Sequence, residues 1–314
     1  MWKSLKDRAE GVKQMKRMKT TEAVGQVLCH DITQIIPGVT KDAVFRKGHI
    51  IREEDIPVLL SVGKDSVYIW ENDETMMHEN DAAEVLYRMT ANEHMHPSDV
   101  KEGKIEAIAD TEGLLKVDRE KLKKVNAFGE MMIATRHGNT VVKKGDKLAG
   151  TRIIPLVIKK DKMQEAEKIC DGTPILKILP FTVKKAAIIT TGNEVYHGRI
   201  KDAFTPVIEQ KIAEFGAEMM FHEIFDDNDR KITDGCLRAI EAGADIVFCT
   251  GGMSVDPDDK TPLAIKNTGA EMISYGSPVL PGAMFLLSYY RKGDKVIPIC
   301  GLPGCAMYNR RTIF

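Results

Sequence analysis

The chain has 314 residues, 43% of them hydrophobic and 29% charged, a composition that is typical of a globular protein and allows two domains. Its formal net charge of -1 gives no electrostatic reason to expect nucleic acid or an anionic membrane as a partner. Apolar runs long enough to span a membrane, a secretory signal and paired cysteines are all absent, so we expect a cytoplasmic protein with reduced thiols.

The first part of the chain predicts three segments. Residues 1–19 have the pattern of a short helix or an arm. Residues 20–71 carry short apolar runs separated by glycine and proline, which is typical of a small β-rich unit. Residues 72–180 combine helical patterns with strand-like pieces and predict an α+β domain. The helices predicted here span residues 55–62, 80–92, 118–127 and 162–170.

Residues 181–314 show a different pattern, in which strands and helices alternate. Continuous apolar runs are typical of strands that are buried on both faces of a sheet. The alternation predicts an α/β domain with three layers, doubly wound around a mostly parallel sheet. Ligands bind beyond the carboxyl ends of the strands in such sheets. The strands are expected at 186–190, 218–225, 245–250 and 296–300, and the helices at 206–215, 229–242, 261–268 and 305–314.

Three loops follow three of these strands and should therefore meet at one edge of the sheet. In the first loop, Gly192 allows a sharp turn with exposed N–H groups. The hydroxyls of Thr190 and Thr191 suit a phosphate, and Glu194 suits a metal or a ligand amino group. An ordinary turn at the end of a strand is an equally good interpretation of this loop.

The second loop contains Gly251 and Gly252, which would let a ligand approach the backbone closely. It leads to a helix that begins near Thr261, with Asp259 or Thr261 as the expected N-cap, and the N-terminus of a helix favours an anion. The third loop, residues 301–305, also lies between a strand and a predicted helix.

The acidic residues of these loops predict a cation. Asp226 and Asp259 would repel a phosphate unless a cation lay between them, and Mg²⁺ is the natural choice. The alternative for each is that it caps a helix. A helix start favours a reactive cysteine, but the sequence offers Cys305 no histidine partner, so we interpret it as structural.

Three of the eight histidines lie within residues 78–96. His78, His94 and His96 have no cysteine or carboxylate at a familiar metal-ligand spacing, so we expect surface histidines and not a metal site.

Residues 181–314 resemble the molybdopterin-binding domain shared by molybdopterin molybdenumtransferases, molybdopterin adenylyltransferases and competence-damage-inducible proteins. The resemblance rests on five motifs in the family's order and spacing, which are specific as a set. They are Thr191–Glu194, Asp226–Asp227, Thr250–Val255, Asp259–Pro262 and Gly301–Gly304.

The resemblance implies that the domain binds molybdopterin or adenylylated molybdopterin. In the molybdenumtransferases, molybdate is inserted at the dithiolene and AMP is released, with Mg²⁺ assisting. Glu194, Asp226 and Asp259 then fall on essential acidic positions, and Asp226 and Asp259 are the expected Mg²⁺ ligands. The residues expected to contact the ligand are Thr190, Thr191, Gly192, Asn193, Thr250, Gly251, Gly252, Met253, Ser254, Lys260, Thr261, Pro303 and Gly304.

The sequence departs from the molybdenumtransferase pattern in four places. One is the stretch 201–204, which keeps the acid Asp202 but lacks the usual Thr-Asn. Two lysines suited to molybdate are missing, since the matching segment has Leu280 and Ala283. Cys305-Ala306 stands where the family has Asn-Pro, and the transferases' N-terminal Ser-Ala-Met-Asp-Gly-Tyr-Ala segment is absent. We therefore expect a divergent N-terminal half. Because the resembled family usually continues, we also expect a domain truncated at its C-terminus.

Three functions remain open. The first is molybdate insertion by an enzyme of molybdenum cofactor biosynthesis. The second is a non-catalytic carrier or sensor of the cofactor, which the missing lysines favour. The third is a nucleotide pyrophosphatase of the competence-damage-inducible type, since Asp258–Thr261 is similar to the Asp-Asp-x-Thr of those relatives. We expect a small pterin or nucleotide ligand, with a homo-oligomer and a molybdoenzyme client as open alternatives.

Overall fold

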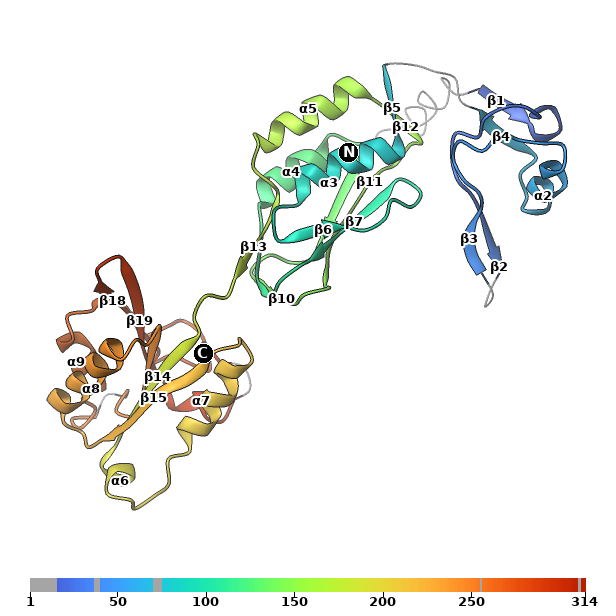
Figure 1. Ribbon diagram of the computed structural model, residues 1–314. Coiled ribbons are helices and arrows are strands. Elements are labelled where there is room, and N and C mark those ends of the chain that lie inside the picture. Colours follow the sequence, from blue (N-terminus) through green and yellow to red (C-terminus); the bar gives the residue numbers. More distant parts are fainter. Residues whose placement is uncertain (1–15, 37–39, 70–74, 255, 310–311) are drawn as a thin grey trace. The chain divides into compact units, whose positions relative to one another are not determined.

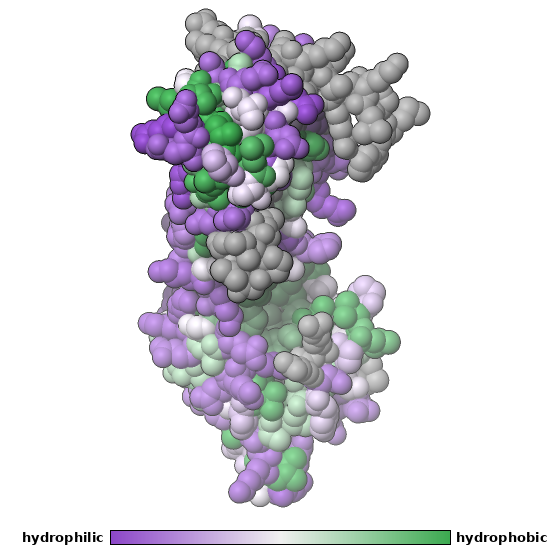
Figure 2. Space-filling model, turned by 90° about the vertical axis from the view of Figure 1, so that its right-hand side faces the viewer, coloured by the Kyte–Doolittle hydropathy of each residue, from purple (hydrophilic) through white to green (hydrophobic). Residues whose placement is uncertain are grey.

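The computed structural model describes residues 16–36, 40–69, 75–254, 256–309 and 312–314. The chain forms two compact units, residues 1–180 and 181–314 (Figure 1). Within the described ranges, no helix is both long enough and apolar enough to cross a membrane. On the face drawn in Figure 2, hydrophilic side chains cover most of the surface and apolar side chains form smaller patches.

The first part of unit 1 is built from two strand pairs around a small apolar core that contains Leu28, Leu59 and Val67. The last four residues of the expected N-terminal helix or arm form a strand, and residues 1–15 lie outside the described residues. The antiparallel pairs are β1 (Lys16–Lys19) with β4 (Ser66–Ile69) and β2 (Ile32–Ile36) with β3 (Thr40–Phe45), and the helices are η1 (Thr20–Glu22) and α2 (Asp55–Ser61).

The second part of unit 1 combines three helices with three sheets. Its helices are α3 (Glu79–Thr90), α4 (Arg119–Ala127) and α5 (Lys160–Cys170), which confirms the three predicted helices. One sheet has the order β6 (Met95–Pro97), β7 (Lys104–Ala109), β11 (Lys147–Ile153), β9 (Met131–Thr135). A second has the order β10 (Thr140–Val142), β8 (Gly113–Val117), β13 (Leu176–Pro180), and β5 (Met76–His78) pairs with β12 (Val157–Lys159).

The expectation of a surface histidine is wrong for His78, which is 3% exposed. Its Nδ1 accepts a hydrogen bond from the Asn80 N–H (3.2 Å), so the imidazole caps α3. Burial lowers the pKa of His78, and the charge of Lys47 lowers it further. The spacing of metal ligands, on which the expectation rested, does not show that an imidazole would serve as a helix cap. His96 is exposed and lies 2.6 Å from an oxygen of Asp110.

Unit 2 is the predicted α/β domain with three layers. Its six-stranded sheet has the order β15, β14, β16, β19, β18, β17; the first four strands are parallel to one another, and β18 is antiparallel to both of its neighbours, β19 and β17. Helix α7 covers one face, while α8 and α9 cover the other (Figure 1). The strands are β14 (Lys185–Thr191), β15 (Glu218–Phe225), β16 (Ile246–Thr250), β17 (Glu271–Tyr275), β18 (Leu286–Lys292) and β19 (Lys295–Leu302). The helices are α6 (Asn193–Tyr196), α7 (Phe204–Ala213), α8 (Asp229–Glu241), α9 (Thr261–Asn267) and η2 (Gly304–Ala306).

Successive side chains of β14 pack into different hydrophobic cores on the two faces of the sheet, as expected for a strand buried on both faces. Ala186 and Ile188 pack on the α7 side, while Ala187 and Ile189 pack on the α8 and α9 side. The apolar run that predicted this strand therefore reflects two cores. It also fixes the faces of the next two residues, Thr190 and Thr191.

The helix expected at 305–314 is wrong. The described residues contain only the three-residue turn η2, in which the Ala306 N–H donates to Pro303 O (2.9 Å). The apolar residues of this segment serve the core instead: the ring of Phe314 packs at 69° against that of Phe248, with the centroids 5.1 Å apart. Tertiary packing, rather than helical periodicity, thus sets the conformation of this segment.

Candidate functional site

The structure brings the first two loops together at the carboxyl ends of β14 and β16. Thr191 Oγ1 donates to Thr250 O (3.0 Å) and lies 3.1 Å from Thr261 Oγ1. Thr261 Oγ1 in turn donates to Gly251 O (2.8 Å). These buried hydroxyls tie the end of each strand to the start of α9. Thr261 is therefore not the N-cap of α9, which begins without a side-chain cap.

The paired glycines of the second loop are required by the packing of the loops on each other. Gly251 has φ +82°, and a Cβ there would lie 2.1 Å from Thr191 O. Gly252 has φ +53°, and its Cβ would lie 2.9 Å from Thr261 Oγ1. A side chain at Gly251 would force the two loops apart, and one at Gly252 would displace the hydroxyl of Thr261. The space that these glycines leave is thus filled by the protein itself.

Gly192 and Glu194 form the first loop. Gly192 has φ +137°, and the carboxylate of Glu194 folds back over it, so that a Cβ on Gly192 would lie 3.0 Å from Glu194 Oε1. Glu194 and Asn193 are both exposed. The loop therefore presents an exposed carboxylate beside an exposed amide at the edge of the sheet.

Thr190 lies on the other face of the sheet from Thr191. Its Oγ1 lies 3.1 Å from Asp202 Oδ2, 3.2 Å from Thr205 Oγ1 and 3.1 Å from His222 Nε2. Burial raises the pKa of Asp202, but hydrogen bonds from Thr205, Phe204 and Thr190 outweigh it, and the pKa lies below its usual value. Thr190, at 2% exposure, is thus part of a buried polar cluster that anchors the start of α7.

Thr250 lies beside Thr190 in the sheet and has a fully buried hydroxyl, for which the described residues offer no hydrogen-bond partner. Met253 is also buried, because its thioether packs over Gly301: a Cβ at residue 301 would lie 2.5 Å from its Sδ. The Met253 carbonyl accepts a hydrogen bond from Tyr275 Oη (3.1 Å). The predicted ligand contact Met253 therefore holds the second loop on the core.

The two aspartates after β15 differ sharply. Asp226 forms an ion pair with Lys231 (2.8 Å). Asp227 Oδ2 instead accepts the Asn193 N–H (3.1 Å) and so reaches the first loop. Burial raises the pKa of Asp227, and the charges of Glu194, Asp258 and Asp226 raise it further. The sequence singled out Asp226, whereas Asp227 is the carboxylate that faces the other acids. Asn228, and neither aspartate, caps α8.

Asp259 also holds a local turn, because its Oδ2 accepts the Asp256 N–H (3.0 Å). Ser254 and Asp258 are exposed, and Lys260 is half-buried. In the third loop, Pro303 is buried and Gly304 is exposed at the start of η2. Among the described residues, no group of three or more His, Cys, Asp or Glu side chains is arranged to hold a metal ion by itself.

The segment that lacks the two lysines lies between β17 and β18. Leu280 is 85% exposed, and Ala283 is half-buried, with its carbonyl accepting the Ser277 N–H (2.8 Å). Gly282 has φ +136°, and a Cβ there would lie 2.4 Å from Ile313 Cγ2. Position 280 would therefore carry a lysine into solvent without disturbing the core.

Two protein families match parts of the chain. Residues 187–313 match the family described as "Probable molybdopterin binding domain". The C-terminal unit is a member of this domain family. Residues 17–71 match a domain of unknown function, DUF8806. The molybdopterin-binding domain thus spans the loops described above, and the divergence expected for the N-terminal half agrees with a separate family there.

The chain is also similar to curated proteins and to solved structures. It is 30% identical over 129 residues to the "Putative competence-damage inducible protein" of Bacillus cereus, a match that covers 41% of this chain and 30% of that protein. The Bacillus velezensis protein of that name is 32% identical over 85 residues, which cover 27% of this chain and 20% of that protein. The matched stretch is thus less than a third of the length of these relatives.

Among solved structures, the tungsten cofactor synthesizing protein MoaB from Pyrococcus furiosus is 20% identical, with a TM-score of 0.33, covering 40% of this chain and 84% of that one. A molybdenum cofactor biosynthesis protein from the same organism is 13% identical, with a TM-score of 0.23, covering 94% of this chain and 60% of that one. The assignment of residues 187–313 therefore rests on the family match.

Proposed function

We propose that unit 2 binds molybdopterin or adenylylated molybdopterin at the loops after β14, β15 and β16, in molybdenum cofactor biosynthesis. The observation that carries this proposal is the family match over residues 187–313, which includes all of these loops. Exposed groups suited to the ligand are Asn193, Glu194 and Ser254, while Thr191 and Thr261 hold the loops together. We further propose the cytoplasm as the setting, with a homo-oligomer and a molybdoenzyme client as candidate partners.

We propose molybdate insertion with release of AMP as the reaction. Breaking a phosphoanhydride needs positioned phosphates and a compensated charge. Glu194 and Asp227 are the acids best positioned to act on the ligand. The Asp227 carboxylate accepts a hydrogen bond from the first loop, and the charges of Glu194 and Asp258 repel it. Asp226 pairs with Lys231 through Oδ2 and leaves Oδ1 buried without a partner among the described residues, and Asp259 accepts the Asp256 N–H.

Mg²⁺ fits this arrangement as a cation bound by both the protein and the substrate. Mg²⁺ is commonly held by one or two carboxylates together with substrate phosphates. The pKa of Asp227 is raised first by burial and then by neighbouring carboxylates, so a cation there would stabilise its charged form. Asp227 and Glu194 would hold it together with the substrate phosphates, and it would offset the charge that develops on those phosphates.

The test is AMP release from adenylylated molybdopterin by the full chain, with and without molybdate and Mg²⁺. We expect release that depends on molybdate, a loss of at least about a hundredfold in Asp227→Asn, and little change in the matched neighbour Asp226→Asn. Absence of molybdate-stimulated release would reject the reaction. Equal losses in both variants would reject the choice of Asp227.

A second candidate function is a non-catalytic carrier of the cofactor, which the exposed Leu280 favours. A lysine there would attract an oxyanion, whereas a leucine cannot. Restoring both charges in Leu280→Lys/Ala283→Lys separates the two functions. A carrier would gain molybdate-dependent AMP release only in this variant. An active wild type would release AMP already, and the variant would add little.

A third candidate is a nucleotide pyrophosphatase, which the similarity to competence-damage-inducible proteins favours. The acids Asp258 and Asp259 precede Lys260 and Thr261, as in the Asp-Asp-x-Thr of those relatives. Hydrolysis of ADP-ribose by the full chain with a divalent metal would support this function, and its absence with Mg²⁺, Mn²⁺ and Co²⁺ would remove it.

A further inference from the structure

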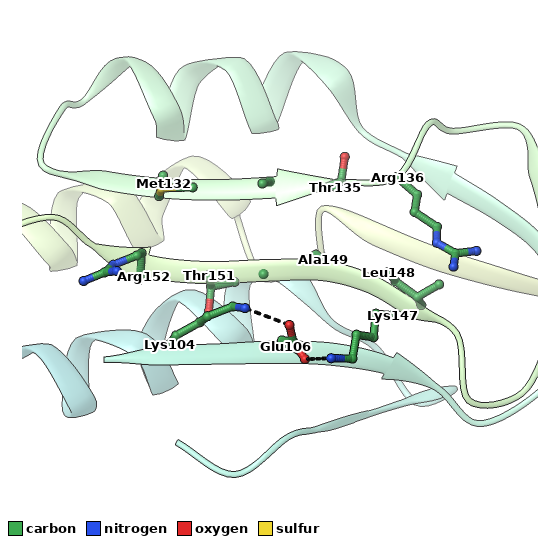
Figure 3. A pocket seen from close by; sticks show the side chains of 12 residues that line it. Lys104, Glu106, Met132, Thr135, Arg136, Lys147, Leu148, Ala149, Thr151 and Arg152 are labelled. Carbon is green, nitrogen blue, oxygen red and sulfur yellow. Dashed lines mark hydrogen bonds and ion pairs between the residues drawn. The ribbon is translucent and has the colours of Figure 1, made fainter. Parts of the chain in front are cut away.

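Unit 1 carries an open groove of about 460 Å³ on one face of the sheet β6-β7-β11-β9 (Figure 3). The opposite face of this sheet is in the core, where Ala107, Ile133 and Ile153 pack with residues of α3, α4 and α5. The groove is lined by Lys104, Glu106, Met132, Ala134, Thr135, Arg136, Lys147, Leu148, Ala149, Gly150, Thr151 and Arg152.

Strand register explains why this face is hollow. Glu106 of β7 lies opposite Gly150 of β11, and Gly150 lies opposite Ala134 of β9. These three residues form a row across the sheet, and two of them have almost no side chain. The row two residues away has Arg152 between Lys104 and Met132. Large side chains thus form a wall beside a floor of small ones. The groove crosses the strands.

Gly150 is not required by the fold. Its backbone does not adopt positive φ, and the nearest atom to a Cβ there would be Lys104 Cε at 3.4 Å, an ordinary contact. Gly251 of unit 2 is the opposite case. A glycine inside a strand weakens it, and commonly marks a place where another molecule approaches closely. Keeping the floor clear is the physical reason left for glycine at this position.

The walls of the groove are basic. Four cations line it, against the single carboxylate of Glu106. Glu106 binds Lys104 (2.7 Å) and Lys147 (2.6 Å), and these two bonds hold the pKa of Glu106 below its usual value. Each ammonium group has three donors, so both lysines keep donors for a ligand. The groove therefore favours an anion even with Glu106 ionised.

The two arginines of the walls differ in their contacts. Arg136 is held by both oxygens of Asp146, at 2.9 and 3.2 Å. Arg152 donates from Nε to Ile153 O (3.1 Å), and within the described residues its terminal nitrogens have no hydrogen bond. A guanidinium with a free outer edge suits the two oxygens of a carboxylate.

We propose that this groove docks an acidic segment of a partner protein, with one apolar side chain over Gly150 and Ala134 and carboxylates on either side. The basic walls supply the charge complementarity. Met132 is 39% exposed and the side chain of Lys147 is 67% exposed, so a small molecule would stay largely in water, unlike ligands in enclosed pockets. A protein segment continues past the groove and buries its open sides.

The probe is a fluorescein-labelled peptide of about ten residues with Glu-Glu-Leu-Glu-Glu at its centre, which is long enough to cross three strands. Fluorescence polarisation with the full chain measures its binding at about 50 mM and about 300 mM salt. We expect binding that weakens at high salt. Gly150→Val fills the floor while favouring a strand, and Arg152→Glu reverses a wall charge; each should weaken binding about tenfold.

The matched control is Arg119→Glu, which makes the same charge change on exposed α4. It should weaken binding by less than about twofold. Equal losses in Arg152→Glu and Arg119→Glu would overturn the proposal in favour of unspecific attraction. Three further results would also overturn it. They are full binding by a folded Gly150→Val variant, a wild-type affinity for the peptide weaker than about 1 mM, and displacement of the peptide by AMP.

Discussion

The loop edge of unit 2 and the sheet face of unit 1 both contain glycines, but for opposite physical reasons. At the loop edge, Gly251 is held at φ +82° with Thr191 O where its Cβ would be. On the sheet face, Gly150 has ordinary backbone geometry and room for a Cβ. The first glycine is required by the fold. The second could be replaced by a larger residue without harm to the fold, so its presence is better explained by a molecule that binds there.

The same distinction separates the acids of unit 2. Asp202 is stabilised by its neighbours, and its pKa lies below the usual value. Asp227 is opposed by burial and by surrounding carboxylates, and its pKa is raised. A charged group whose environment destabilises the folded state is a better candidate for function than one that stabilises it. Four substitutions break or sharpen this contrast.

The largest effect is expected for Gly251→Ala. The new methyl group would lie 2.1 Å from Thr191 O, in a backbone conformation that alanine avoids. We expect unit 2 to lose at least about 3 kcal/mol of stability. Hydrogen–deuterium exchange resolved by segment is the measurement, with faster exchange in β14 and β16 and no change in unit 1. A loss below about 1 kcal/mol would contradict the packing role of this glycine.

Much of this edge was predictable from the sequence. The apolar runs at 186–190 and 245–250 predicted strands buried on both faces, and parallel strands bring their following loops together. The sequence could not tell Asp226 from Asp227, because adjacent residues point in different directions and only the fold shows which one meets Asn193. The groove was invisible for a similar reason, since Glu106, Gly150 and Ala134 meet only through strand register.

The second effect is that of Asp202→Asn. Asp202 Oδ1 accepts the N–H groups of Phe204 (2.8 Å) and Thr205 (3.1 Å) and thereby fixes the start of α7. An asparagine keeps one acceptor oxygen but loses the charge and the second acceptor that the hydroxyls of Thr190 and Thr205 use, so we expect a loss of about 1–2 kcal/mol at neutral pH. Because the folded pKa is depressed, the wild-type stabilisation is present above the usual aspartate pKa and is lost as the pH falls through the folded value.

Urea unfolding at a series of pH values checks this prediction. The difference between wild type and Asp202→Asn should be constant at neutral pH and should shrink as the pH falls below the usual aspartate pKa. A difference that does not change with pH would show that the carboxylate charge does not contribute.

Asp227→Asn is expected to act in the opposite direction on stability. Replacing a carboxylate whose pKa is raised by burial and by Glu194, Asp258 and Asp226 removes repulsion. We expect unit 2 to be unchanged or stabilised by up to about 1 kcal/mol, although AMP release is lost. The sign follows from the raised folded pKa, so any gain should be largest at neutral pH and vanish in acid. Thermal unfolding at pH 7 and pH 4 measures it. A destabilised variant would place Asp227 with Asp202, among the acids that the fold requires.

The smallest effect is that of Gly150→Ala, and it carries the contrast between the two glycines. An alanine at this position meets only Lys104 Cε at 3.4 Å and avoids the entropic cost of glycine in a strand. We expect a gain of about 0.5 kcal/mol in the stability of unit 1, measured by segment-resolved hydrogen exchange in β7, β9 and β11. The same methyl group lies on the floor of the groove and should weaken the binding of the acidic peptide by about twofold to fivefold. Stability and binding would then move in opposite directions at one residue, which a purely structural glycine such as Gly251 cannot produce. A loss of stability in Gly150→Ala would mean that this glycine, too, is required by packing, and the case for a surface kept clear for a partner would fail with it.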